Sequence, residues 1–107
     1  MTVKALTDLG FSAVTLPDPD REIDGVYIGD LLSWVMGRAS AGNAWLTIMS
    51  NKNIVAVASL ADAACIIVTE GVELDDEITS LSSNKGINIL SFAGSTYDAA
   101  VLLHDLL

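Results

Sequence analysis

Carboxylates are the commonest side chains here that could bind a metal or act as acids and bases. One group alternates as in the first half of a calcium loop: Asp18, Asp20, Glu22 and Asp24. The other residues that a calcium loop needs are absent, because Ile23 replaces the turn glycine and Gly29 occupies the twelfth position, where a bidentate Glu is needed. We therefore interpret this stretch as a solvated acidic loop.

The other reactive side chains do not form a catalytic set. A second acidic group comprises Glu70, Glu73, Asp75, Asp76 and Glu77, and its last three members stand where negative charge favours the start of a helix. His104 is the only histidine and has no serine or cysteine near it in sequence, as a nucleophilic triad would need. Cys65 lies in an apolar run without a second thiol. The sequence thus predicts no enzyme, no metal site and no cofactor.

The elements that must position any site alternate between strand and helix patterns. Strand-like runs cover 44–50, 65–71 and 87–92, with helical patterns between them, and the front half adds runs at 11–16 and 23–28. This alternation is typical of βα units and parallel pairing. We expect an α/β fold with a mixed, largely parallel five-stranded sheet covered by helices, and one domain over residues 1–107.

Helix signals surround these strands. Thr2 can cap a first helix that Gly10 ends, and Ser95 with Asp98 predicts the start of the last one. The helix after Gly29 and Asp30 carries two overlapping apolar stripes, and both are expected to be buried. The stripes are Leu31, Trp34 and Val35, and Leu32, Val35, Met36 and Ala39. Trp34 and Trp45 are accordingly predicted to be largely buried.

Polar residues follow the predicted strands, at the edge where open α/β sheets bind ligands. The candidate ligand-binding residues are Gly29, Asp30, Ser50, Asn51, Lys52, Asn53, Thr69 and Gly71. The same residue types are also what turns and caps require. Lys52 is the only cation among them, and Asp30 and Glu70 would oppose an anion.

Composition limits the partners. Fourteen acidic residues against five basic ones give a formal charge of −9, which repels nucleic acid and anionic membranes. Hydrophobic residues make up 51% of the chain, yet no apolar run is long enough to span a bilayer, and residues 1–4 do not lead into a signal peptide. We expect a cytoplasmic protein. So apolar a chain also predicts a homodimer.

The span from Gly42 to Phe92 resembles the DRTGG domain family. Thr69-Glu70-Gly71 stands where the family has Thr-Gly-Gly, and Asn51-Lys52 stands in the region of its Asp-Arg pair. Residues 20–36 resemble the corresponding segment of stand-alone members of this family, which are related to the N-terminal domain of HPr kinase. The resemblance implies an α/β domain similar to the N-terminal domains of HPr kinase and the Mur ligases. It also implies a non-catalytic element of the kind that accompanies phosphotransacetylase and CBS-pair pyrophosphatase.

Two functional hypotheses follow. The first is a non-catalytic regulatory module that self-associates and senses a small metabolite or contacts a protein partner. The alternative is a nucleotide-binding sensor that uses the carboxyl edge of the sheet near Asn51 to Asn53, Thr69 and Gly71. An enzyme ranks third, because the sequence shows no cluster of titratable groups.

Overall fold

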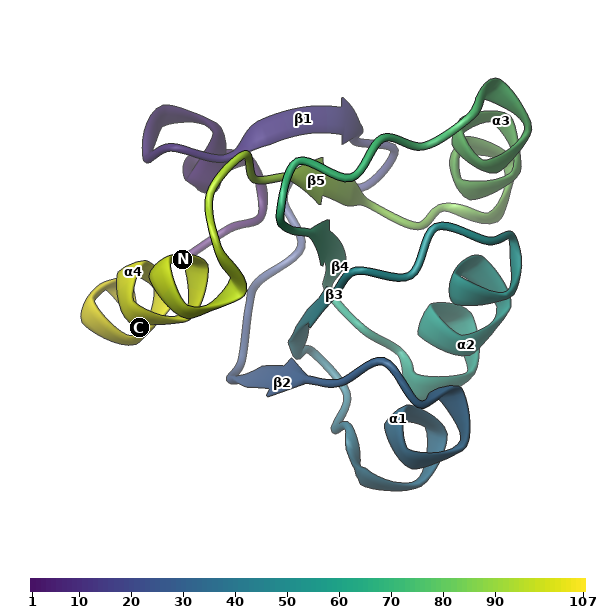
Figure 1. Ribbon diagram of the computed structural model, residues 1–107, viewed down its shortest axis with the longest axis horizontal. Helices are drawn as coiled ribbons and strands as arrows, with labels where there is room; N and C mark the ends of the chain where they lie inside the picture. The colour runs from purple at the N-terminus through teal and green to yellow at the C-terminus, as the bar shows by residue number, and fades with distance from the viewer.

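The computed structural model describes residues 1–107 and contains one five-stranded sheet in the order β1-β5-β4-β3-β2 (Figure 1). Strands β2 to β5 are parallel, and β1 pairs antiparallel with β5. The predicted mixed, largely parallel sheet is thus confirmed. The elements in chain order are η1 (Lys4–Asp8, a 3-10 helix), β1 (Ser12–Thr15), β2 (Val26–Ile28), α1 (Leu32–Arg38), β3 (Ala44–Thr47), α2 (Asn53–Ala61), β4 (Cys65–Val68), α3 (Asp76–Lys85), β5 (Ile89–Ser91) and α4 (Thr96–Leu106).

Helices cover both faces of the sheet. Successive strand residues point to opposite faces, so each central strand supplies two hydrophobic cores. Leu46, Ile67 and Leu90 belong to the core beneath η1 and α4. Trp45 and Ile66 belong to the core beneath α1, α2 and α3. Figure 1 shows these two groups of helices on opposite sides of the strands.

Both helices of the second half, α3 and α4, are capped, and the cap of α4 at Ser95 is the predicted one. The Asp75 carboxylate accepts a hydrogen bond from the Ile78 amide at 3.0 Å and so caps α3. That helix ends at Gly86, whose φ of 73° is the left-handed conformation of a common C-cap. The Ser95 hydroxyl accepts from the Asp98 amide at 3.0 Å and caps α4. None of the helices is long and apolar enough to cross a membrane.

The prediction that Trp34 is buried was wrong. The helix α1 has only seven residues and packs against α2, and Val35 is its one fully buried side chain. The stripe through Leu31 and Trp34 faces away from the core, so 52% of Trp34 is exposed. The guanidinium of Arg38 covers its ring at 3.7 Å from the centroid.

Other boundaries differ from the sequence prediction in smaller ways. The predicted strand at 23–28 is reduced to three residues, because β2 pairs with β3 only from Val26 onward. The first helix is a 3-10 helix, and the Ala5 amide donates to the Thr2 hydroxyl at 3.3 Å.

The two tryptophans provide a matched test of this packing. Trp45 is fully buried and its indole N–H donates to the Gly29 carbonyl at 2.9 Å. Trp45→Ala should therefore lower the free energy of unfolding by about 3–5 kcal/mol. Trp34→Ala should lower it by less than about 1 kcal/mol, as is usual for a surface residue. Chemical denaturation measures both, and equal losses would contradict the assigned exposures.

Candidate functional site

The carboxyl ends of the four parallel strands meet at one edge of the sheet, where Thr69 lies at the centre. Thr69 is fully buried, and its amide donates to the Thr47 carbonyl at 3.1 Å. Its hydroxyl oxygen lies 2.6 Å from that of Thr96, so the two share a hydrogen bond. Thr69 thus joins β3, β4 and the start of α4, and it is not free to contact a ligand.

Glu70 occupies the N-terminus of α4. One carboxylate oxygen accepts from the Thr96 amide at 2.7 Å, and the Glu70 amide donates to the Gly94 carbonyl at 2.8 Å. These bonds hold Glu70 in the left-handed region at a φ of 63°, which is uncommon for a residue other than glycine. The positive end of the helix dipole is therefore already neutralised by a carboxylate of the chain itself.

The Asp30 carboxylate is also engaged in hydrogen bonds within the chain. One of its carboxylate oxygens accepts from the Thr47 hydroxyl at 2.7 Å and from the Ile48 amide at 2.9 Å. The Thr47 hydroxyl oxygen in turn accepts from the Met49 amide at 3.1 Å. Asp30 therefore fixes the loop that leaves β3 and connects it to the end of β2.

The start of α2 satisfies most of its own amides. The Asn51 side chain accepts from the Asn53 amide at 2.9 Å, and the carbonyls of Asn51 and Lys52 accept from Ile54 and Val55. Ser50 and the three residues that follow it are exposed, and none of them lines a hollow of the surface. Lys52 forms no ion pair.

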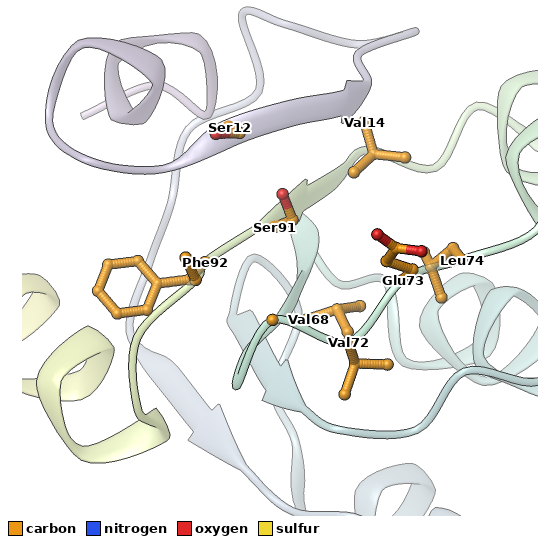
Figure 2. A pocket seen from close by; sticks show the side chains of 10 residues that line it. Ser12, Val14, Val68, Val72, Glu73, Leu74, Ser91 and Phe92 are labelled. Atoms are coloured by element: carbon orange, nitrogen blue, oxygen red, sulfur yellow. The ribbon is translucent and has the colours of Figure 1, made fainter.

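A hollow of about 400 Å³ lies at the same edge, on the face that carries α3. Its size falls within the range of small-molecule sites. Figure 2 shows Ser12 and Ser91 on neighbouring strands at one side of the hollow and the segment Val72–Leu74 at the other. Ser12 and Ser91 are partners in the antiparallel register of β1 and β5, so their hydroxyls stand on the same face. The remaining lining residues are Val14, Val68, Gly71, Phe92 and Ala93.

The hollow has a defined chemical character. It presents two hydroxyls, apolar side chains and one carboxylate, that of Glu73, and no Lys, Arg or His lines it. The backbone amides of Glu73 and Ala93 donate no hydrogen bond within the chain. Such a lining suits an uncharged or cationic group that has polar atoms as well as an apolar surface.

The reactive side chains lie apart from this edge or are inert. Burial raises the pKa of the Cys65 thiol to about 12, and Cys65 is enclosed in the core. His104 is exposed on α4. The chain forms no cluster of three or more His, Cys, Asp or Glu side chains that could hold a metal ion.

The acidic loop at 18–24 is held by hydrogen bonds and ion pairs. The Asn88 amide group donates to the Asp18 carbonyl at 2.7 Å, and its oxygen accepts from the Asp18 amide at 2.9 Å. Arg21 pairs with Asp62 at 3.0 Å, and this hydrogen bond lowers the pKa of the Asp62 carboxyl. Glu22 pairs with the N-terminal amine at 2.9 Å.

The mixed sheet with helices on both faces defines a small α/β domain. Residues 20–106 match the model of the DRTGG domain. The chain therefore belongs to the DRTGG domain family. No curated protein matches the sequence.

The fold is shared with a solved structure. It is the crystal structure of the CBS and DRTGG domains of the regulatory region of Clostridium perfringens pyrophosphatase, complexed with its activator diadenosine tetraphosphate. The similarity has a TM-score of 0.71 at 18% sequence identity and covers 94% of the present chain. The present chain spans 44% of that chain, so the regulatory region contains a large part with no counterpart here.

The structure brings some of the sequence candidates together and separates others. Thr69 and Gly71 belong to one turn, and only Gly71 lines the hollow. Gly29 and Asp30 are tied to β3, and Ser50 to Asn53 form an exposed loop and helix start. Sequence reasoning missed Ser12 and Ser91. The only signal for them was a serine in each of two strand-like runs, whose pairing the sequence did not show.

Glu70 provides a test of this edge. Glu70→Ala removes the acceptor for the Thr96 amide and keeps the strained left-handed backbone, so the free energy of unfolding should fall by about 1–2 kcal/mol. Glu70→Gly removes the same acceptor but relieves the strain, and the loss should be smaller by about 1 kcal/mol. Chemical denaturation compares the two variants. Equal losses would show that the backbone at Glu70 is not strained.

Proposed function

We propose that this DRTGG domain is a non-catalytic regulatory module that senses a small metabolite at the carboxyl edge of its sheet. The hollow beside Ser12 and Ser91 is the observation that supports this proposal. It lies where open α/β folds bind ligands and it combines apolar walls with a few polar groups. The family membership and the fold shared with a regulatory region support the same role.

The turn at Glu70 and Gly71 would connect the hollow to the rest of the domain. Gly71 lines the hollow, and the preceding two residues bond to Thr96 at the start of α4. A ligand in contact with this turn would therefore act on a segment whose hydrogen bonds also position α4. Sensing needs such a link, because a ligand shifts the equilibrium between two conformations of a protein only if it makes different contacts with each of them.

The second candidate is a nucleotide sensor, and the activator bound by the pyrophosphatase regulatory region favours it. The Glu73 carboxylate on the rim would repel a phosphate group. A nucleotide would accordingly place its uncharged base or ribose in the hollow. Lys52, at the exposed start of α2, is the cation at this edge available to a phosphate.

Calorimetric titration distinguishes these candidates. The probes are adenine nucleotides, sugar phosphates, adenosine, and unphosphorylated amines and polyols. If the hollow binds the ligand, Ser91→Leu should abolish the heat because its side chain fills the space, and Lys52→Ala should leave the affinity unchanged. If phosphate binds at the start of α2, Lys52→Ala should weaken the affinity markedly and Ser91→Leu should not.

Glu70→Gln is the matched electrostatic control. It keeps an oxygen that can accept from the Thr96 amide and removes the negative charge, so the fold should be preserved. Affinity for a phosphate-bearing probe should then increase through relief of repulsion. The absence of heat from every probe would contradict the sensing function. Thermal unfolding of each variant checks that it is folded.

We further propose that the module self-associates as a homodimer in the cytoplasm and that it is related to the N-terminal domain of HPr kinase. Large apolar side chains on and beside α1 are exposed, which supports self-association. They are Leu31, Trp34 and Met36. Sedimentation at micromolar concentration and moderate salt should show twice the monomer mass. A monomer throughout that range would exclude self-association from the function.

A further inference from the structure

The terminal strand β2 has an unused hydrogen-bonding edge. The Gly25 carbonyl accepts from the Ala44 amide, and the Gly29 amide donates to the Leu46 carbonyl, so both bonds run to β3. Along a parallel strand the N–H and C=O groups of successive residues point alternately to one side and to the other. Tyr27 lies two residues from both Gly25 and Gly29, so its backbone groups also point toward β3. The N–H and C=O groups of Val26 and Ile28 face outward. No further strand lies beyond β2 (Figure 1).

An apolar groove runs beside this edge, between β2 and α4. It has a volume of about 790 Å³, twice that of the hollow at the carboxyl edge. Ile28 is 51% exposed here, and Leu107 is 49% exposed. A strand added to β2 would direct every second side chain into this groove. The groove is lined by Val26, Ile28, Ala100, Leu103, His104 and Leu107, with Gly25 and Tyr27.

The charges around the edge are negative at both of its ends. Asp24 precedes β2 and Asp30 follows it, and both are exposed. Asp105 is exposed on α4 beside His104 of the groove. Lys and Arg are absent from the groove lining. An added strand with basic residues at its ends would therefore be attracted, and an acidic one repelled.

The same charges disfavour a second copy at this edge. Two β2 strands paired antiparallel about Tyr27 would bring Asp24 of each chain toward Asp30 of the other. Like charges that face each other across strands destabilise the pairing. The formal charge of −9 on each chain adds to the repulsion.

We propose that β2 is a docking edge for an extended segment of another protein, apolar at alternate positions and carrying Lys or Arg at its ends. Backbone hydrogen bonds to Val26 and Ile28 hold the segment, as in other complexes formed by strand addition. Its alternate apolar side chains fill the groove beside α4. Attraction to Asp24, Asp30 and Asp105 selects a basic partner. This surface is separate from the hollow at Ser12 and Ser91.

The test measures binding of a fluorescent peptide with alternating valine and threonine between pairs of lysines, by anisotropy with the whole chain. Ile28→Pro removes an outward N–H without removing a bond to β3, and edge strands tolerate proline. It should weaken binding by about tenfold or more. Ile28→Ala is the matched control, because it shortens the same side chain and keeps the N–H; its loss should be smaller.

Charge is tested separately. Asp24→Lys should weaken binding of the lysine-flanked peptide and strengthen binding of a glutamate-flanked one, and added salt should reduce both differences. Equal affinity of the wild type for the two peptides would overturn the proposal, as would unchanged binding by Ile28→Pro. Conversion of a wild-type dimer to a monomer by Ile28→Pro would also overturn it, because the edge would then bind a second copy. None of these results bears on ligand binding in the hollow.

Discussion

The complete burial of the central strands on both faces is the constraint from which the rest of the structure follows. Every residue of β3 and β4 is buried, from Ala44 to Thr47 and from Cys65 to Val68. Each large apolar side chain removed from water in this way stabilises the fold by about 1.5–3 kcal/mol. Helices must therefore cover both faces. The polar ends of the strands are left at the sheet edge, which is why turns and a hollow occur there.

Much of the fold could be predicted because the local signals agree with it. The run at 65–68 is apolar without alternation, which is typical of a strand buried on both faces. Ser95, Asp75 and Gly86 act as caps, and capping depends only on nearby residues. The exposure of Trp34 could not be predicted in this way. An apolar stripe shows which face of a helix is apolar, whereas its burial depends on what the sheet places beside that helix.

The candidate site was less predictable, because its interactions join residues far apart in the chain. The carboxyl edge and its polar residues could be predicted, because these residues directly follow strand-like runs expected to pair in parallel. That Glu70 caps α4 depends on the position of Thr96, and that Ser12 faces Ser91 depends on an antiparallel pairing between the two ends of the sequence. The candidate polar groups at Thr69 and Asp30 proved to be occupied by bonds within the chain. A residue type suited to a ligand is often equally suited to a turn.

The pairing of β1 with β5 also determines the order in which the chain can complete its fold during synthesis. β1 has no partner in the sheet other than β5, which begins at Ile89, so residues near the N-terminus leave the ribosome long before their partner exists. Phe11, whose ring lies 5.0 Å from that of Phe92, must stay exposed or loosely associated in the meantime. The parallel unit of β2, β3 and β4 can form first, because its connections are shorter. The N-terminal segment can complete its pairing only after β5 has been synthesised.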